Sequence, residues 1–528
     1  MNRAELIAHE TSHMWFGDLV TMDWFDDVWT KEVFANYFAA RIVEPLFPEI
    51  NHTQNKLKTF TAASLSEDRT MGTNAIRQPL DNLRNAGLIY GQIIYNKAPV
   101  MMEKLVDKMG EANFRSGIQE YLKTYSYGNA TWDDLIRILD SKTTEDLAAF
   151  SDVWVNRKGM PTLTFRTDGQ ELEICQHDPY NRGLLWPQRF AVTLCGERDS
   201  VIRVNMTDTL FRMQLPFVPS RVLPNTDGRG YGVFVPDESA LHWLAAHWWE
   251  IEDDTARQSL LMVLYENYLA KHISADDWVN SLITGLPAEK NALVASTASG
   301  YLANVMREIA PANRAEVETR IYTMTQNHPL PSCRIQLMRL FMQNAISEPM
   351  VKKLYILWQQ QSDKHLNRQD YTTLAYELAI RMPLESEQIL RTQRARIDDP
   401  DRLRQFDFIS RAAVSDTARL DTLFNSLLAA ENRRIEPWTT AVIRYLNHPL
   451  REDQSVKYIR PGLEVLEEVQ RTGDIFFPKN WAAALLGNHL SSSAYEEVVR
   501  FLNERPDYSP LLKNKILQAA YPLYRANN

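Results

Sequence analysis

Histidine and glutamate residues near the start of the chain have the spacing of a metal site. The sequence reads His9-Glu10-Thr11-Ser12-His13, and residues four apart lie on one face of a helix. Two imidazoles that converge on one point suit a zinc ion. Glu10 would then lie beside a zinc-bound water as a candidate general base. The pattern predicts a metal site that can activate water.

Two predicted helices would position these groups. Residues 3–16 have the apolar periodicity of an amphipathic helix, and Gly17 is a plausible stop. A second helical pattern runs from about Asp27 to Ile42 and contains Glu32, nineteen positions after His13. A carboxylate near the middle of such an apolar helix is costly to bury without a partner, and zinc would be that partner.

Chance is the alternative explanation. With the composition of this chain, HExxH is expected by chance in roughly 1–2% of sequences of this length. The histidines would then be an ordinary helical pair with nothing bound. The helical context of both segments instead favours a metal site formed by His9, His13 and Glu32.

The residues around these positions resemble the aminopeptidase N (alanyl aminopeptidase) family of zinc metallopeptidases, which are of the gluzincin type. In that family HExxH is followed by Trp-Phe-Gly-Asn-x-Val-Thr and then by Trp-Leu-Asn-Glu-Gly-Phe-Ala. The corresponding segments here are Trp15-Phe16-Gly17-Asp18-Leu19-Val20-Thr21 and Trp29-Thr30-Lys31-Glu32-Val33-Phe34-Ala35. The resemblance implies that His9, His13 and Glu32 bind one Zn2+ per chain and that Glu10 is the catalytic base.

A further segment resembles the family's Tyr-x-Lys-Gly-Ala signature, whose tyrosine stabilises the oxyanion. It reads Tyr95-Asn96-Lys97-Ala98-Pro99, and the resemblance implies that role for Tyr95. Pro99 suits the first turn of a helix, which Gly110 would end. The alternative is that Tyr95 is an ordinary core tyrosine beside Ile93 and Ile94.

The chain departs from the family pattern around two of these residues. Thr30, Lys31 and Val33 replace the usual Leu, Asn and Gly near the third ligand. Ala98 and Pro99 replace Gly-Ala after the tyrosine. None of these changes removes a ligand, but each could reshape the specificity pocket.

One family motif does not occur in the sequence. The exopeptidase motif Gly-x-Met-Glu-Asn, whose glutamate binds the substrate's α-amine in the family, is absent from the 528 residues. We therefore expect an N-terminally truncated member without the β-rich lobe that covers the zinc helix. Leu6 and its apolar neighbours would then face solvent. We expect this chain alone to bind zinc weakly and to have little aminopeptidase activity, and a missing N-terminal segment or a complementing chain is a candidate partner.

Composition excludes some classes of protein. Hydrophobic residues make up 45% and charged residues 24%, which is ordinary for a soluble globular chain. The net charge is −9 without a basic block, so we expect no nucleic-acid partner. No apolar run is long enough to span a membrane. Cys175, Cys195 and Cys333 lack metal-site spacing and favour buried free thiols. The compartment stays open between cytoplasmic and periplasmic or secreted, because a signal peptide could precede Met1.

The pattern of elements predicts a mainly α protein with a small β domain. We expect residues 1–160 to form a partial zinc-peptidase catalytic domain, the helical lobe of a thermolysin-like fold. Residues 161–236 alternate as about seven short strands of a β-sandwich. Residues 237–528 read as a C-terminal, HEAT-like α-helical array. In that region Trp243, Trp248 and Trp249 are expected in the core, while His242 and His247 are expected to be structural or exposed.

These observations predict a zinc-dependent aminopeptidase that removes N-terminal residues from peptides. One alternative is a non-catalytic helical-array scaffold or peptide-binding protein with a vestigial zinc site. Another is a zinc endopeptidase or epoxide hydrolase that needs no amine anchor. Metal content and the position of peptide cleavage would separate these three classes.

Overall fold

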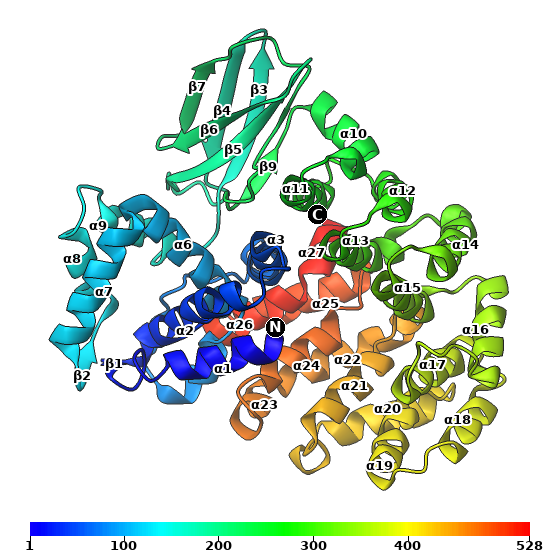
Figure 1. Ribbon diagram of the computed structural model, residues 1–528. Helices are drawn as coiled ribbons and strands as arrows, with labels where there is room; N and C mark the ends of the chain where they lie inside the picture. Colours follow the sequence, from blue (N-terminus) through cyan, green and yellow to red (C-terminus); the bar gives the residue numbers. More distant parts are fainter. The chain divides into compact units, whose positions relative to one another are not determined.

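The computed structural model describes residues 1 and 3–528, and most of them lie in helices (Figure 1). The chain forms two units, Met1–Ile273 and Ser274–Asn528. The second unit is helical, whereas the first contains helices and all of the described strands. The expected class, mainly α with small sheets, is confirmed.

The first two helices of the first unit pack against each other. Helix α1 (Asn2–Ser12) contacts α2 (Val28–Val43) through a small apolar cluster of Ala8, Ala39 and Val43. Helix α2 begins and ends within one residue of the predicted limits, but Ile42 near its end is exposed.

Helix α1 is shorter than the predicted helix over residues 3–16. It ends at Ser12. The backbone amides of Met14 and Trp15 donate hydrogen bonds to the carbonyls three residues earlier, whereas an α-helix would use the carbonyls four residues earlier. Gly17 then has φ +134°, which favours glycine, and its amide donates to the Val20 carbonyl. The helix therefore ends before the stop predicted at Gly17, and a non-helical turn replaces its predicted last turn.

The remaining helices of the first unit follow the sequence signals closely. The signals at Pro99 and Gly110 mark the start and end of one helix as predicted, and Thr131 with Asp134 forms a capping box on another. The helices are α3 (His52–Lys56), α4 (Ala62–Asp68), α5 (Ala86–Ile89), α6 (Ala98–Met109), α7 (Glu111–Tyr125), α8 (Trp132–Asp140), α9 (Leu147–Trp154), α10 (Glu238–His247) and α11 (Asp254–Leu269). Strand β1 (Val20–Met22) pairs in parallel with β2 (Gly128–Ala130).

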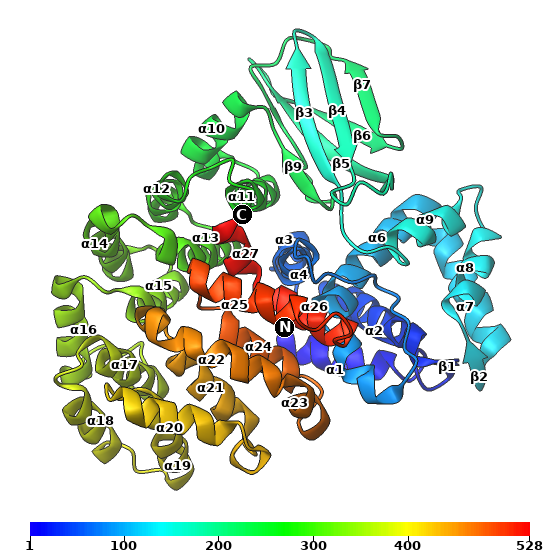
Figure 2. The ribbon, with the colours of Figure 1, turned by 180° about the vertical axis from the view of Figure 1, so that it is seen from behind.

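Two small sheets face each other between residues 162 and 235 (Figure 2). One has the order β7-β4-β3-β9 and the other β6-β5-β8. Alternate residues of both sheets share one core, because side chains two apart on a strand lie on the same face. The strands are β3 (Thr162–Asp168), β4 (Glu171–His177), β5 (Gln188–Cys195), β6 (Ser200–Met206), β7 (Leu210–Gln214), β8 (Arg221–Leu223) and β9 (Val233–Val235).

Helices α10 and α11 belong to the first unit, because α11 packs on β9 and on α3. The division at residues 160 and 236 stays a prediction, and the boundary between the two units lies at residue 273. Trp248 is fully buried as expected, but Trp243 and Trp249 are only partly buried, so the core prediction is wrong for these two. The Arg221 guanidinium lies 4.3 Å from the Trp243 ring centre and covers one face of it.

Helices of the second unit pack on helices that lie one to three places further along the chain, as in a helical array (Figures 1 and 2). Several begin with proline in the first turn, where a missing amide hydrogen costs nothing. They are α12 (Ala275–Gly285), α13 (Ala292–Val305), α14 (Pro311–Asn327), α15 (Pro331–Asn344), α16 (Glu348–Gln360), α17 (Arg368–Arg381), α18 (Ser386–Ala395), α19 (Pro400–Ile409), α20 (Thr417–Leu427), α21 (Glu436–Leu446), α22 (Glu452–Glu464), α23 (Leu466–Thr472), α24 (Phe477–Leu486), α25 (Ser492–Asn503), α26 (Pro510–Ala519) and α27 (Tyr521–Asn527).

Two expectations from composition can be compared with the described residues. Cys175, Cys195 and Cys333 are all free thiols, of which Cys195 and Cys333 are buried. Among the residues that the structure describes, no helix combines the length and the apolar character that a membrane span requires.

A buried histidine lies between α24 and α25 in the second unit. The Asn447 amide nitrogen donates to the Ile443 carbonyl, so its oxygen faces His489, whose Nε2 donates to it over 2.9 Å. His489 is fully buried, and this burial lowers its pKa to about 4 from an ordinary 6.5. The folded protein therefore holds this imidazole neutral.

We predict that the second unit loses stability in mild acid through His489. Between pH 6.5 and about 4 the unfolded chain binds a proton at this position and the folded chain does not, so stability falls as pH falls. From pH 7 to 4.5 the loss is about 2–3 kcal/mol. Chemical denaturation should show that His489→Gln, which keeps a donor toward Asn447, removes this part of the acid loss. The exposed His365→Gln is the matched control, and an equal acid loss in all three proteins contradicts the assignment.

Candidate metal centre

The two histidines of the HExxH segment face each other at the end of α1. His9 lies in the last turn, and His13 follows the last helical residue with helical backbone angles, φ −60° and ψ −22°. The early end of the helix therefore leaves the i, i+4 relation intact. The Nε2 atoms of the two rings are 3.2 Å apart, and the rings are perpendicular.

Helix α2 brings Glu32 to the same point. Its Oε2 atom lies 3.6 Å from Nε2 of His9 and 3.8 Å from Nε2 of His13. Among the described residues, these three form the one group of histidine, cysteine or acidic side chains with the closeness that a metal site needs. The predicted juxtaposition of two imidazoles and a carboxylate from the next long helix is therefore present in the structure.

The outer nitrogens of both rings are committed to carbonyl oxygens. Nδ1 of His13 donates to the Phe16 carbonyl over 3.1 Å, and Nδ1 of His9 donates to the Asn36 side-chain oxygen over 2.9 Å. These tautomers are assigned from their partners, because a carbonyl oxygen can only accept. In the neutral rings both Nε2 atoms then present lone pairs to each other and to the Glu32 carboxylate.

This donor set fits a zinc ion. In a tetrahedral site with bonds of about 2.0–2.1 Å, neighbouring ligand atoms are roughly 3.3–3.5 Å apart. The observed separations of 3.2, 3.6 and 3.8 Å are close to that range. Three acceptors that face one another repel unless a cation or a proton lies between them. Hydrogen bonds from each outer nitrogen to a carbonyl are also the usual support for metal-bound histidine.

Charge and burial act on these groups in opposite directions. The Glu32 carboxylate, 3.6 Å from Nε2 of His9, favours the protonated imidazole and raises the pKa of His9 against the effect of burial. Burial raises the pKa of Glu32, but the nearby His9 ring and the Lys31 charge outweigh burial and lower that pKa overall. The buried Glu32 is therefore held as a carboxylate, the form that binds metal.

Glu10 lies on the opposite side of α1 from the packed face and is exposed. Leu6 and Ile7 of α1, and Met14 and Trp15 in the turn after it, are also exposed, with exposed fractions of 59%, 61%, 59% and 45%. The expectation that Leu6 and its apolar neighbours face solvent is confirmed. The Glu10 charge contributes to the raised pKa of His9, as the carboxylate of a residue adjacent to the ligand should.

Tyr95 lies on a π-helical turn, η5 (Ile93–Lys97), that packs against α2. Its ring stacks on Tyr90 with centres 5.9 Å apart, and it is half-buried, whereas Ile93 and Ile94 are both 1% exposed. Burial raises the pKa of Tyr95, and the Glu32 charge raises it further. The phenol is therefore a hydrogen-bond donor at neutral pH and lies within electrostatic reach of the third ligand.

Sequence reasoning missed two residues that support this centre. Asn36 follows Glu32 by one helical turn and contacts both His9 and the Tyr95 backbone. Lys97 pairs with Asp68 over 2.7 Å, and both side chains are completely buried. A polar residue one turn after the third ligand, on an otherwise apolar helix, was the available signal for Asn36.

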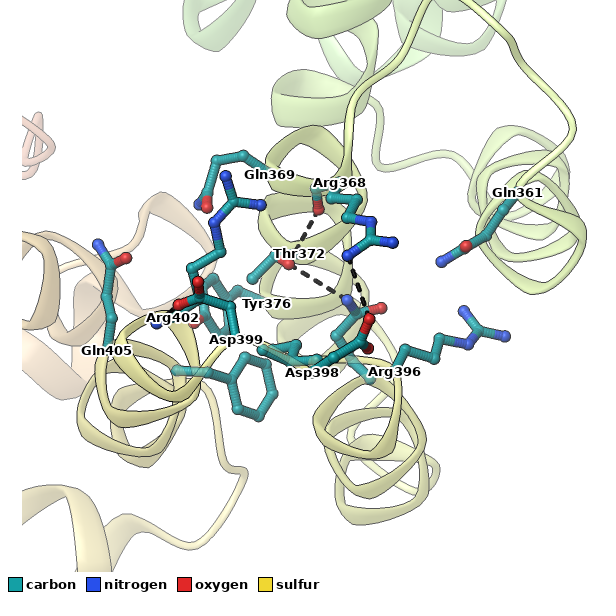
Figure 3. Close-up of a pocket in the computed structure, with 13 residues that line it drawn as sticks. Gln361, Arg368, Gln369, Thr372, Tyr376, Arg396, Asp398, Asp399, Arg402 and Gln405 are labelled. Carbon is teal, nitrogen blue, oxygen red and sulfur yellow. Dashed lines mark hydrogen bonds and ion pairs between the residues drawn. The ribbon is translucent and has the colours of Figure 1, made fainter.

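Other polar groups outside the centre have ordinary structural surroundings. His242 is exposed and bonds within its own helix, and His247 stacks on Trp243 at 4.8 Å, as expected for structural or exposed residues. A surface pocket of about 300 Å3 lies between α17, α18 and α19 (Figure 3). Its lining includes Arg368 and Asp398, which form an ion pair over 3.3 Å, and none of the predicted site residues.

A HExxH segment on one helix and a carboxylate from the next are typical of metal-dependent hydrolase sites. Comparison with known families supports the coarser class, a peptidase. Residues 1–154 match the Peptidase family M1 domain. This match covers less than a third of the chain, and over those residues the chain is similar to family M1 peptidases.

Curated relatives match part of the chain at modest identity. Tricorn protease-interacting factor F2 of Thermoplasma volcanium is 31% identical over 34% of this chain and 23% of its own length. Endoplasmic reticulum aminopeptidase 2 of Homo sapiens is 31% identical over 43% of this chain and 28% of its own. Aminopeptidase N of Lactococcus lactis subsp. cremoris is 28% identical over 46% and 28%. The chain thus spans about a quarter of the length of these relatives.

We predict that one divalent ion binds each chain at this centre and that Glu32→Ala weakens its binding by at least tenfold. Removal of one of three protein ligands leaves the two imidazoles without a neutralising charge. Competition with a chromophoric zinc chelator measures the affinity. Glu49→Ala, which removes an exposed carboxylate outside the cluster, should leave it unchanged. Equal zinc affinity of Glu32→Ala and the unaltered chain would place the ion elsewhere.

Proposed function

We propose that this chain is a zinc-dependent aminopeptidase that hydrolyses the N-terminal residue of peptides. One observation supports it above the rest: three lone-pair donors, from His9, His13 and Glu32, meet with the separations of a tetrahedral site. The M1 domain and relatives that are named aminopeptidases support the peptidase class. The preference for a peptide's N-terminus rests on those relatives.

In the proposed reaction, different side chains hold the metal, transfer protons and stabilise the oxyanion. His9, His13 and Glu32 hold the zinc ion, which when bound supplies a Lewis acid that polarises the scissile carbonyl and makes water acidic. Glu10 accepts a proton from the attacking water and delivers it to the leaving amine. The Tyr95 hydroxyl donates a hydrogen bond to the oxyanion that develops on the substrate carbonyl.

The solvent exposure of α1 around Glu10 lowers the rate of peptide hydrolysis that we expect. Glu10 is surrounded by water and by exposed apolar side chains, so charges that form beside it act in a high dielectric. Electrostatic stabilisation of a transition state is weaker there than in a closed site. We therefore expect slow peptide hydrolysis by this chain. The assay must use a high enzyme concentration.

We predict that Glu10→Gln retains zinc but lowers kcat for an alanine arylamide by about 10²–10⁴-fold, the usual contribution of a general base. Tyr95→Phe should lower kcat by about 10²–10³-fold, as removal of one oxyanion donor does. Steady-state kinetics, with metal content measured on the same samples, provides the test. Glu49→Gln and Tyr127→Phe alter exposed residues of the same types and serve as matched controls.

The substrate panel separates the three classes of function. Cleavage of the free arylamide but not of its N-acetylated form supports an aminopeptidase. Internal cleavage of a blocked peptide supports an endopeptidase, and absence of both metal and turnover supports a scaffold. Turnover by Glu10→Gln at the unaltered rate contradicts the assigned base, whichever substrate is used.

A further inference from the structure

A single amide joins the metal centre to the segment that contains Tyr95. Asn36 on α2 accepts a hydrogen bond at Oδ1 from Nδ1 of His9 over 2.9 Å. Its Nδ2 donates to the backbone carbonyl of Tyr95 over 2.9 Å. Asn36 is partly buried, so both bonds are shielded from water on the side where they form. The Asn36 side chain thus contacts both His9, a candidate metal ligand, and the backbone of Tyr95, the candidate oxyanion donor.

The two bonds fix each other's direction. A backbone carbonyl accepts only, so the Asn36 atom that faces Tyr95 must be the NH2 group. The oxygen of the same amide then faces His9, whose Nδ1 must carry the hydrogen. In the neutral ring Nε2 is left with its lone pair, which points toward His13 and Glu32. The position of the Tyr95 carbonyl therefore decides the tautomer of His9.

The Tyr95 carbonyl is itself held in place from the far side of its turn. Lys97, two residues later in η5, donates from Nζ to the Gly159 carbonyl over 2.8 Å and pairs with Asp68 over 2.7 Å. The Tyr231 hydroxyl donates to the same Asp68 carboxylate over 3.1 Å. Because these side chains are buried and fully paired, they hold η5 against the body of the first unit.

We propose that Asn36 is a positioning residue that couples the tautomer and orientation of His9 to the placement of Tyr95. Through its amide, a shift of the η5 backbone changes the orientation of the His9 ring, and a shift of that ring changes the position of the η5 backbone. The catalytic part of this inference rests on the proposed aminopeptidase function, whereas the tautomer and metal part does not. Supporting groups of this kind usually change metal affinity by about 10–100-fold when removed.

Two substitutions separate the two bonds. Asn36→Leu has nearly the same size and removes both bonds. Asn36→Asp keeps an acceptor for His9 and removes the donor to the Tyr95 carbonyl. Asn113→Leu is the matched control, because Asn113 is an exposed asparagine of α7 whose amide donates to the Met109 carbonyl at the end of α6, away from the centre. Circular dichroism and thermal unfolding verify that each variant keeps the fold.

The first measurement does not depend on activity. Nitrogen NMR of histidine-labelled protein, with His9 assigned by its loss in His9→Gln, reports which ring nitrogen is protonated before and after zinc is added. We expect a single Nδ1–H tautomer in the unaltered chain and in Asn36→Asp, and mixed tautomers in metal-free Asn36→Leu. Zinc should bind Asn36→Leu about 10–100-fold more weakly and Asn36→Asp within about threefold of the unaltered chain.

The second measurement tests the coupling to Tyr95. If Asn36 places Tyr95, then Asn36→Asp lowers kcat and Tyr95→Phe lowers it little further in the same protein, with KM nearly constant. Independent effects that multiply in the double variant overturn the coupling to Tyr95. An unchanged His9 tautomer and zinc affinity in Asn36→Leu overturn the positioning role altogether. Failure of the proposed aminopeptidase function would instead leave all variants inactive while the tautomer and zinc effects of Asn36→Leu persist.

Discussion

Three hydrogen-bond acceptors that face one another are the constraint on which this part of the molecule depends. Nδ1 of His9 and of His13 is each committed to a carbonyl oxygen, so the two Nε2 lone pairs and the Glu32 carboxylate converge. Such a cluster is unfavourable without a cation, and natural structures rarely leave buried acceptors in this state. The surrounding elements can be understood as the means by which the chain holds these acceptors together.

The packing of α1 on α2 provides the first of these means. Ala8 allows α1 to approach Ala39 and Val43 of α2 closely, because none of the three side chains is large. Phe16 stacks on Phe34 with ring centres 4.3 Å apart, which fixes the turn whose carbonyl receives the His13 hydrogen bond. The same stacking explains why α1 can end at Ser12 without displacing His13.

A buried network of charged and polar side chains is the second feature that holds the three acceptors together. Lys97, Asp68 and Tyr231 satisfy one another in the interior of the first unit, although each would be costly to bury alone. Tyr231 also has its backbone bound by the Gln188 side chain at the start of β5. The β-sandwich therefore helps to hold the η5 turn, and through Asn36 it is connected to His9. Breaking any one of these contacts would leave a buried polar group without its partner.

Sequence patterns alone predicted that His9, His13 and Glu32 cluster, the two helices that present them, the strands between residues 162 and 235 and the helical nature of the rest. These features depend on local spacing, on hydrophobic period and on Gly and Pro signals, all of which are properties of short segments. These patterns did not determine where α1 ends, which tryptophans are buried, or that Asn36 and the Lys97–Asp68 pair support the centre. Those features depend on contacts between residues far apart in the chain. The direction of the Asn36 amide, for example, is set by the Tyr95 carbonyl 59 positions away, a relation that only the packed tertiary structure creates.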